Sequence, residues 1–383
     1  MKSCRDINCQ ISPIMLAPDI DVAILGGGCA GLSLAVRLAQ SNLSVHVIEP
    51  RSTYINDRTW SFWRTRSDPF ETCVRKEWSF WAVSGDQGCT TRTSSYMRYQ
   101  SVDSGAFYKF ACDTIAKSNQ TQLSLGVSAE SVERLGTGWK VTTSTGTFTA
   151  KTVVDTRPPK RTPIYGQFFL GREIKTERPV FDSDVVQLMQ FRRARSSGVD
   201  FVYILPFSAN QALVEVTSFA PSKPSHQVFS NWLDIEIDAL SGGHIETLRT
   251  ESGSLPMEAN FADIVPDGMI RMGLGGCAAR PSTGYAFSRI QMQADQVALA
   301  LMTDKVPKTQ LDGSITQFMD RVFLQVLSSS PSRGAAYFET LFRKAPRDKL
   351  ERFLSGSTRT ADRLSVMASL PPLPFLRATL FPI

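Results

Sequence analysis

The stretch that most constrains the fold of this chain runs from residue 21 to residue 49, DVAILGGGCAGLSLAVRLAQSNLSVHVIE. A short apolar run, Asp21–Leu25, leads into a glycine-rich turn, and an apolar helical pattern follows the turn. A second apolar run, Ser44–Ile48, ends at an acid, Glu49. The order of strand, glycine turn, helix, strand and acid predicts a βαβ unit that binds a dinucleotide near the start of the chain.

Each glycine of the turn has a physical role in a unit of this kind. Gly26 permits the tight turn, Gly28 lets a pyrophosphate approach the backbone, and Gly31 lets the helix pack closely on the strand. Gly27 lies in the same turn, and we assign it to the same cofactor site. Glu49 follows Gly31 by 18 residues, close to the spacing expected of an acid on the ribose hydroxyls. The acid argues against a 2′-phosphate in this site.

Length and composition restrict the class of protein. At 383 residues the chain exceeds one hydrophobic core of ordinary size, so we expect two lobes. Apolar residues make up 42% and charged residues 20%, which is typical of a soluble globular protein. We expect no transmembrane helix, because no run approaches the roughly 18 consecutive apolar residues that one needs. The first twenty residues, which proline interrupts, predict an irregular tail rather than a signal peptide.

Cysteine and histidine are used sparingly. The seven cysteines are scattered without a C-x-x-C pair, and the three histidines lack a ligand spacing. We therefore predict neither a disulfide framework nor a metal site. We expect the protein to lie in a reducing compartment. With so few histidines, acid–base chemistry falls to carboxylates.

A polar and aromatic cluster follows the βαβ unit, with the sequence Asn56-Asp57-Arg58-Thr59-Trp60-Ser61-Phe62-Trp63. In one interpretation it is a loop whose aromatic rings pack under the edge of the domain. In the other, its polar groups, Arg58 among them, lie next to the cofactor with a flat apolar surface beside them. Composition alone leaves both interpretations open.

Further along, a hairpin pattern returns the chain to the nucleotide-binding unit. Trp139–Thr143 and Thr147–Val154 are predicted to be antiparallel strands around a Ser-Thr-Gly turn. Asp155 ends the second strand. We interpret Asp155 as a structural residue rather than a cofactor contact.

From residue 167 to about residue 256 the chain predicts a lobe built on a β-sheet. The strand candidates are Val185–Phe191, Phe201–Leu205 and Gln211–Phe219. In the last of these, period-two alternation divides the side chains between two mostly apolar faces. One face takes Leu213, Glu215, Thr217 and Phe219, and the other takes Ala212, Val214, Val216 and Ser218.

Glu215 is thus a carboxyl in a strand without an obvious solvent side. Desolvation in such a place raises the pKa of a carboxyl and keeps it protonated, as a general acid requires. The alternative is a glutamate at a strand edge that pairs with Arg192 or Arg193. The pattern alone leaves the two open.

A second glycine signature occupies residues 269–301. A short apolar strand meets Gly275 and Gly276, and a Pro-Ser-Thr-Gly turn ends at Gly284. A helix follows, and we expect its start near residues 282–284 to offer free backbone N–H groups to an anion or a flavin edge. Glycines that only allow close packing are the alternative, but the order of elements favours a cofactor role. The helix should bury a stripe formed by Phe287, Ile290, Ala294, Val297 and Leu301.

Residues 313–383 are predicted to be helical, with a basic balance. They hold ten Lys or Arg and five Asp or Glu, and so carry +5 of the net charge of +6. We expect the first helix to pack on the second lobe through one apolar stripe. The basic, amphipathic remainder could rest on a membrane surface. The stripe comprises Ile315, Phe318, Met319, Val322, Phe323, Val326 and Leu327.

Five segments together resemble one family, the flavin-dependent lycopene cyclases of carotenoid synthesis and in particular their bacterial lycopene beta-cyclase type. The resemblance runs from about Asp21 to Leu376. The segments are GGGxxG…IE, NDRTWSFW, LPFSANQALVEVTSF, GGCAARPSTGYAF and FLSGSTRTADRLSVMASLPPLPFL.

The resemblance implies an isomerase that uses FAD in reduced form, with NAD(P)H as the reductant and no net redox change. Its substrate would be lycopene or a related acyclic carotenoid. Each acyclic end would be protonated, would close to a β-ionone ring and would lose a ring proton. The glutamate of the family's L-x-E-x-T strand, Glu215 here, would be the acid. We expect peripheral contact with lipid on the cytoplasmic side of a membrane, and no nucleic-acid partner.

Two departures qualify the resemblance. Several members carry a second acid right after the glutamate, where this chain has Val216, so a two-carboxylate mechanism at this spot is doubtful. Related hydroxylases have Gly-Asp where this chain has Gly275-Gly276, which weakens a monooxygenase interpretation. The rivals are an FAD-dependent monooxygenase or reductase acting on an apolar isoprenoid, and a membrane-peripheral carotenoid-binding protein that holds FAD structurally.

The expected fold is therefore α/β, with three parts. Residues 19–165 and 265–310 form a discontinuous FAD-binding, Rossmann-like domain of the glutathione-reductase or hydroxylase type. Residues 166–264, with parts of 64–110, form a β-sheet substrate domain. Residues 311–383 form a helical region that we expect to face the membrane.

Overall fold

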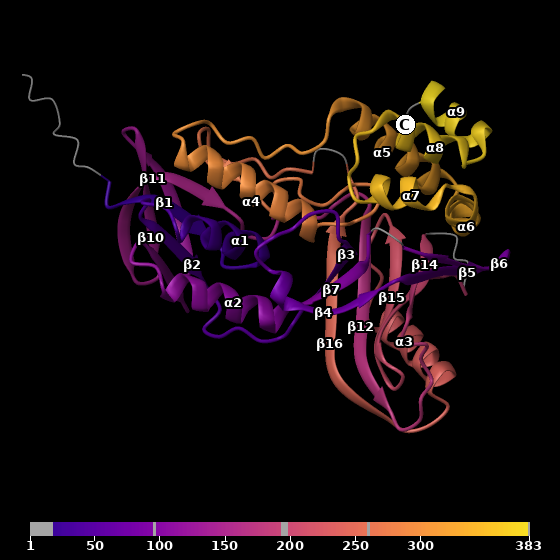
Figure 1. The fold of residues 1–383 in the computed structure, drawn as a ribbon. Helices are drawn as coiled ribbons and strands as arrows, with labels where there is room; N and C mark the ends of the chain where they lie inside the picture. The colour runs from indigo at the N-terminus through magenta and orange to yellow at the C-terminus, as the bar shows by residue number, and fades with distance from the viewer. Residues whose placement is uncertain (1–17, 95–96, 193–197, 259–260, 382–383) are drawn as a thin grey trace, which may run out of the picture.

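The computed structural model describes residues 18–94, 97–192, 198–258 and 261–381. Within these ranges the chain forms three β-sheets with helices packed around them (Figure 1). The α/β class predicted from the sequence is confirmed. The tail predicted for the first twenty residues falls mostly on residues 1–17, and Arg193 also lies outside the described residues.

The first sheet contains the predicted dinucleotide-binding unit. Its strand order is β8-β2-β1-β11-β10-β9, and β17 pairs with β11. Strand β1 (Ile20–Leu25) lies between β2 (Val45–Glu49) and β11 (Gly146–Asp155) and runs parallel to both. The predicted hairpin is β10 paired antiparallel with β11. The other strands are β8 (Thr121–Leu125), β9 (Ala129–Leu135), β10 (Gly138–Thr143) and β17 (Ile270–Arg271).

Both faces of this sheet are buried. Val22 and Ile24 of β1 pack in one core with three helices, α1 (Cys29–Leu38), α2 (Ser104–Ala116) and α4 (Phe287–Met302). Ala23 and Leu25 point the other way, into a core beside β10 and β11. Such near-continuous apolar strands are expected where parallel strands are covered on both sides. The stripe predicted for α4 is confirmed: its first four members are buried and Leu301 packs against the same core.

The second sheet has the strand order β16-β12-β15-β14-β13-β5-β6. The three strand predictions between residues 185 and 219 are confirmed, and residues 80–93 join the same sheet. Its four long strands pair antiparallel. The strands are β5 (Phe80–Gly85), β6 (Gly88–Thr93), β12 (Gly166–Thr176), β13 (Val185–Gln190), β14 (Val199–Ser208), β15 (Gln211–Ala220) and β16 (Ile245–Pro256).

A third, small sheet lies where the two larger sheets meet (Figure 1). Its order is β3-β7-β4, with the short helix η1 (Glu71–Cys73) just before β4. The strands are β3 (Thr59–Trp63), β4 (Val74–Trp78) and β7 (Tyr99–Asp103). The division into three domains stays a prediction.

The two faces of the second sheet pack against different partners. Helix α3 (His226–Ser241) covers one face, where Val214 and Val216 of β15 join its core. Leu213 and Phe219 lie in the core on the opposite face, together with side chains of the C-terminal helices. The alternation predicted along β15 is thus confirmed. We call the face that carries Leu213 and Glu215 the inner face.

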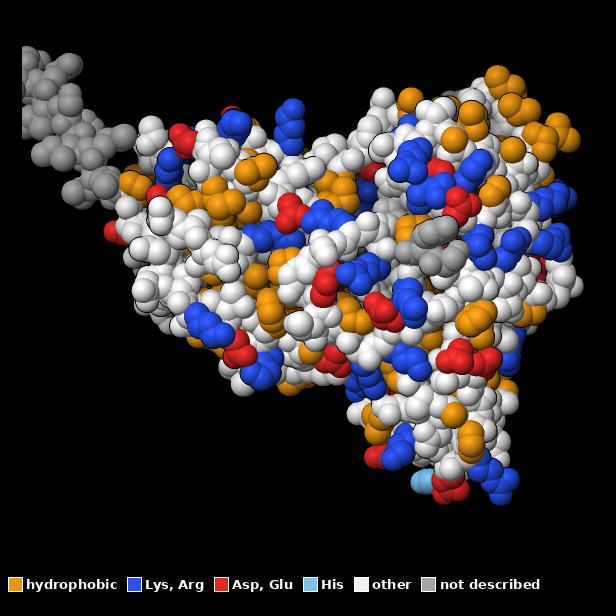
Figure 2. All heavy atoms as spheres, in the orientation of Figure 1, with side chains coloured by type: hydrophobic (Ala, Val, Ile, Leu, Met, Phe, Trp, Pro, Cys, Tyr) orange, Lys and Arg blue, Asp and Glu red, His pale blue; other side chains and the backbone are white. Residues whose placement is uncertain are grey.

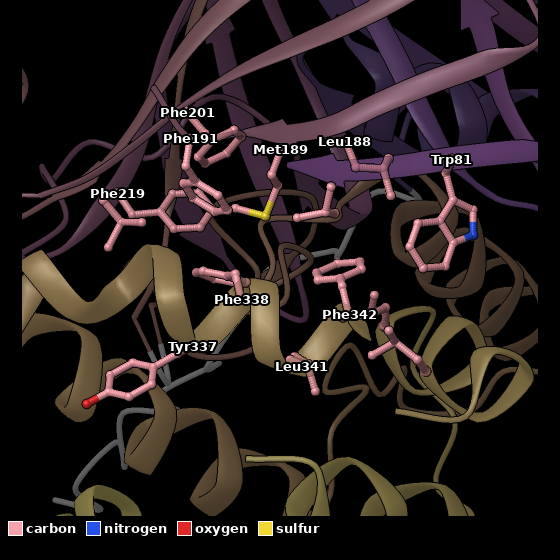
Figure 3. Close-up of a cluster of buried hydrophobic side chains, with 14 of the residues drawn as sticks. Trp81, Leu188, Met189, Phe191, Phe201, Phe219, Tyr337, Phe338, Leu341 and Phe342 are labelled. Carbon is pink, nitrogen blue, oxygen red and sulfur yellow. The ribbon is translucent and has the colours of Figure 1, made fainter. Parts of the chain in front are cut away.

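The C-terminal helices pack on part of the inner face, as Figure 3 shows. Phe338 of α6 lies between Phe191 and Phe219, with ring centroids 6.2 and 5.9 Å apart. Phe342 of α6 meets Trp81 edge to face at 5.4 Å. The predicted helical region is confirmed, and its elements are α5 (Ser314–Ser329), η2 (Pro331–Arg333), α6 (Gly334–Lys344), α7 (Arg347–Leu354), α8 (Thr360–Ala368) and α9 (Pro372–Leu380).

The stripe predicted for α5 is wrong for its first two members. Ile315 and Phe318 are 60% and 47% exposed. Thr316 and Asp320 are buried there instead, because Asp320 forms an ion pair with the buried Arg280 at 3.3 Å. A buried charge must be paired, so this ion pair turns the polar side of the helix inward.

Candidate active site

The glycine turn lies between β1 and α1, where a doubly wound sheet leaves a crevice for a ligand. Gly26 has φ +100°, a conformation that a residue with a Cβ seldom adopts. A Cβ on Gly31 would lie 1.9 Å from the carbonyl oxygen of Gly26. The packing of the chain itself therefore accounts for both glycines.

Gly28 differs from its neighbours, because a Cβ there would meet nothing within 4 Å. It is the N-cap of α1, and among the described residues no side-chain cap hydrogen bond closes the start of that helix. An open backbone at an uncapped helix start suits an anion. Beside it, the Gly27 N–H donates to the Glu49 carboxylate at 2.7 Å, and Arg51 donates to the same carboxylate at 2.8 Å. The turn and Glu49 thus form one fixed unit, with open space beside Gly28.

The polar half of the 56–63 segment contacts helix α2 and strand β16. Asn56 accepts a hydrogen bond from Ser104 at the start of α2, at 2.9 Å. Thr59 donates to the carboxylate of Glu251 at 2.8 Å, and Arg58 donates to the carbonyl of Ser252 at 2.9 Å. The assignment of Arg58 to the cofactor stays a prediction.

The aromatic half of the segment packs in the core. Phe62 and Trp63 are buried, and Trp60 stacks on Phe287 of α4 at 5.5 Å. The packing interpretation is thus confirmed for the aromatic half, and the cofactor interpretation of the polar half stays a prediction.

The glycines after β17 are explained by packing. A Cβ on Gly275 would lie 2.0 Å from the guanidinium of Arg271, and one on Gly276 would lie 2.4 Å from the Arg271 carbonyl oxygen. Arg271 is held in turn by Asp155, which also pairs with Arg157, so the structural interpretation of Asp155 is supported. The cofactor role of the two glycines stays a prediction.

The helix start expected near residues 282–284 is wrong by a few residues. Helix α4 begins at Phe287, because residues 280–284 form a turn in which the Gly284 N–H donates to the Arg280 carbonyl at 2.8 Å. Gly284 has φ +71°, which suits glycine. Its assignment to the cofactor also stays a prediction.

Glu215 lies on the inner face in the middle of β15 and is 6% exposed. Its carboxyl accepts a hydrogen bond from the Thr217 hydroxyl at 2.8 Å. Arg192 does not pair with it, because Arg192 pairs with Glu236 of α3 at 3.1 Å. Among the described residues no lysine or arginine forms an ion pair with Glu215, so the interpretation as an acid is favoured.

Burial and, to a lesser extent, the negative charge of Glu251 together raise the pKa of Glu215 to about 8, although the hydrogen bond from Thr217 opposes the rise. A carboxyl with such a pKa holds its proton near neutral pH. It can therefore act as a general acid there.

Aromatic side chains surround Glu215. Tyr203 is its direct cross-strand partner on β14, and the hydroxyls of Tyr203 and Tyr99 are 2.8 Å apart. Trp63 meets Tyr99 and Tyr285 edge to face, with centroids 4.9 and 5.5 Å apart. Burial raises the pKa of all three tyrosines well above the ordinary value. Neutral aromatic rings around an acid can stabilise a cation formed beside it.

A second carboxylate, Glu251 on β16, faces the same region. It accepts hydrogen bonds from Arg249 at 2.6 Å and from Thr59 at 2.8 Å. Burial raises its pKa, while the charge and hydrogen bonds of Arg249 oppose that rise. We did not predict Glu251 from the sequence.

The fold belongs to a known class. It resembles a geranylgeranyl bacteriochlorophyll reductase-like protein from Thermoplasma acidophilum, with a TM-score of 0.65, 13% identity, and coverage of 94% of this chain and 98% of that one. It also resembles a flavoprotein/dehydrogenase from Cytophaga hutchinsonii, with a TM-score of 0.61, 13% identity, and the same coverage of 94% and 98%. The fold is that of the FAD-dependent oxidoreductases and monooxygenases. The open turn at Gly28 and the acid at the end of β2 fit a dinucleotide cofactor.

The family is narrower than the fold. The family model described as lycopene cyclase protein matches residues 21–380. A lycopene beta-cyclase from Paracoccus sp. is 26% identical over 400 residues, which cover 92% of this chain and 95% of that protein. The chain belongs to the lycopene cyclase family.

Several residues of the site could not be found from the sequence. Glu251 depends on strand register, and Tyr99 and Tyr203 depend on the docking of two sheets. Thr59 had a signal, because it lies in the polar half of the 56–63 segment.

Gly28 and Gly31 give a test of the predicted FAD-binding site at the glycine turn. We expect Gly28→Val to weaken FAD binding by at least about tenfold, because its side chain would fill the open space beside the turn. The melting temperature of the apoprotein should be unchanged. The matched variant Gly31→Ala should lower that temperature, because its Cβ overlaps the backbone. Flavin fluorescence titration and thermal melts measure both. A Gly28→Val protein that binds FAD as tightly as the wild type would contradict an FAD site at this turn.

Proposed function

We propose that this protein is a lycopene beta-cyclase, an enzyme that converts acyclic ends of lycopene to β-ionone rings with FAD in its reduced form and NAD(P)H as the reductant. The observation that supports this most is Glu215, a buried carboxyl without a paired cation among the described residues. The substrate class comes from the family, since the Paracoccus relative is a lycopene beta-cyclase.

The proton steps follow from the position of Glu215. Its carboxyl donates a proton to the terminal double bond of an acyclic end, which leaves a tertiary cation. A second double bond of the chain attacks that cation, and its electron pair closes a six-membered ring. The ring cation then loses a neighbouring proton to the Glu215 carboxylate. The proton given is recovered, so the product is an isomer of the substrate.

The walls around Glu215 suit this chemistry. The buried rings of Trp63 and Tyr99 and the partly buried ring of Tyr203 exclude water, which would otherwise trap the cation as an alcohol. Their faces can also stabilise positive charge.

The cofactor would be held by the N-terminal unit. Backbone N–H groups at the glycine turn would bind the pyrophosphate, and Glu49 would bind the ribose. Reduced FAD, when bound, supplies negative charge that stabilises a cation electrostatically. The proposed cofactor contacts are Gly26, Gly27, Gly28, Gly31, Glu49, Arg58, Gly275, Gly276 and Gly284.

The C-terminal helices offer a surface for membrane lipid. Leu373, Leu376 and Leu380 lie at i, i+3 and i+7 on one face of α9 and are 78%, 56% and 72% exposed. Figure 2 shows apolar side chains gathered over this end of the molecule. Exposed arginines Arg321 and Arg377 lie on α5 and α9. Apolar side chains flanked by arginines are typical of a surface that lies on an anionic membrane.

Such peripheral contact would bring the enzyme to its insoluble substrate. Among the described residues, no helix has both the length and the apolar character needed to cross a bilayer. We therefore propose that the protein rests on the membrane through α9.

Glu215→Gln tests the proposed reaction. In cells that accumulate lycopene, the wild-type protein should give a cyclic product of unchanged mass. The variant should lose ring formation by at least about 100-fold, because Gln has no acidic proton, while FAD stays bound. Chromatography and mass measurement of the pigments read the outcome. The control is Glu236→Gln, which changes a buried carboxylate on α3 and should keep activity. Unchanged lycopene, or an oxygenated or hydrogenated product, from the wild-type protein would rule out a cyclase.

The membrane surface is tested by vesicle flotation. The vesicles contain anionic phospholipid. We expect at least about tenfold less flotation than for the wild type from the triple variant Leu373→Ser/Leu376→Ser/Leu380→Ser, because it removes the apolar area whose burial in the membrane drives binding. The control variant Leu299→Ser/Met302→Ser, which changes exposed apolar residues of α4, should float as the wild type does. Equal flotation of the triple variant and the wild type would contradict the role of α9.

A further inference from the structure

One row of residues crosses the inner face of the second sheet through Glu215. Glu215 pairs in register with Tyr203 on β14 and with Gly171 on β12. Gly171 pairs in register with Glu251 on β16. Residues directly opposite in antiparallel strands point to the same side of a sheet. The two carboxylates therefore lie on the same face, on either side of a residue that has no side chain.

The glycine leaves the path between the carboxylates clear. Neighbouring strands are about 4.8 Å apart, so two strands that flank β12 are about 10 Å apart, within reach of two glutamate side chains. A Cβ at Gly171 would lie 3.3 Å from Cβ of Glu215 and 3.1 Å from a methyl group of Leu213. Any larger side chain there would stand between the two acids.

The two acids have different environments. Arg249 and Thr59 donate hydrogen bonds to Glu251, and Arg58 lies near enough to lower its pKa. Glu215 accepts a hydrogen bond from the neutral Thr217 hydroxyl. A carboxylate with cationic partners ionises before one without them. Environments that drive two pKa values apart are how a pair of acids divides its roles.

We propose, resting on the cyclase function above, that Glu251 is a positioning residue whose negative charge, acting across Gly171, keeps the reactive proton on Glu215. Glu251 stays ionised through the reaction and exchanges no proton. When Glu215 has given up its proton, two negative charges face each other, which favours return of the ring proton to Glu215. The same repulsion thus keeps the proton on Glu215 before the reaction and makes the Glu215 carboxylate a stronger base in the last step.

Other titratable or charged groups also face this region, and none of them replaces Glu251. The tyrosines beside Glu215 are neutral near pH 7, because burial raises the pKa of each. Glu173 is held ionised by Arg75 and Arg249, which lower its pKa to about 2 against the effect of burial. The groups are Tyr99 on β7, Tyr203 on β14, Tyr285 before α4, Glu173 on β12, Arg249 on β16, Arg75 on β4 and Arg58 before β3.

The test is the pH dependence of Glu251→Gln in the FAD-loaded protein. Ring formation needs protonated Glu215, so wild-type activity should fall as pH rises through about 8. Removing the charge of Glu251 lowers the pKa of Glu215, so the fall should move to lower pH by about one unit. Activity at the acidic end should remain. Glu251→Asp, which keeps the charge, should restore most of the wild-type profile.

A second measurement is independent of activity. Infrared spectroscopy follows the C=O band of protonated Glu215, assigned as the band that Glu215→Gln loses. Its titration midpoint should also fall by about one pH unit in Glu251→Gln. Glu236→Gln removes another buried, arginine-paired carboxylate, from the other side of the sheet, and should leave the midpoint unchanged. An unchanged midpoint in Glu251→Gln overturns the proposal, whatever happens to the rate.

The cyclase function and the role of Glu251 are contradicted by different results. A wild-type protein that leaves lycopene unchanged defeats the cyclase function, while the infrared midpoint still reports the coupling of the two acids. If Glu251→Gln does not fold, as loss of bound FAD would show, the reciprocal variant decides. Glu251 ionises while Glu215 is still neutral, so Glu215→Gln should leave the midpoint of Glu251 unchanged and below the midpoint of Glu215 in the wild type. A Glu251 midpoint at or above that of wild-type Glu215 overturns the proposal.

Discussion

The site depends on one constraint, the burial of the Glu215 carboxyl in a sheet that is covered on both faces. Helix α3 packs on one side of that sheet, and the tyrosine-lined inner face lies on the other. With no cation paired to it among the described residues, the carboxyl is most stable when it is neutral, because an isolated buried charge is costly. A neutral acid is also what protonation of an alkene requires. The packing of the sheet and the chemistry of the site therefore have the same cause.

The two larger sheets are connected at the point where this chemistry would occur. Thr59 begins β3, in the segment that follows the nucleotide-binding unit, and its hydroxyl reaches Glu251 on β16. The third sheet, which follows the nucleotide-binding unit along the chain, is thus joined by a hydrogen bond to the sheet that carries Glu215. The helices α6 to α9 complete the inner face, and α9 offers its apolar side outward. Cofactor, acid and membrane contact would each come from a different part of the chain.

Local patterns could be predicted from the sequence, and long-range register could not. The glycine turn and the alternation around Glu215 depend on neighbours in the chain, and both are confirmed. Glu251 was missed because its position opposite Gly171 depends on how β16 aligns with β12. Because Val216 follows Glu215, a second acid next to it in the sequence was doubtful, and Val216 does face α3. The second acid, Glu251, comes instead from strand β16. The first two members of the α5 stripe were mispredicted because an ion pair with a distant arginine, Arg280, buries Asp320.

The most direct test of the account compares the stability of the wild type with that of Glu215→Gln as pH changes. A pKa of about 8 in the folded protein, against 4.5 ordinarily, means that the folded state keeps a proton that the unfolded chain has released. The free energy of unfolding of the wild type should therefore fall, relative to the variant, by about 1.4 kcal/mol for each pH unit between those two values. Urea unfolding curves at several pH values measure it. Parallel curves for the two proteins would contradict a neutral, buried Glu215.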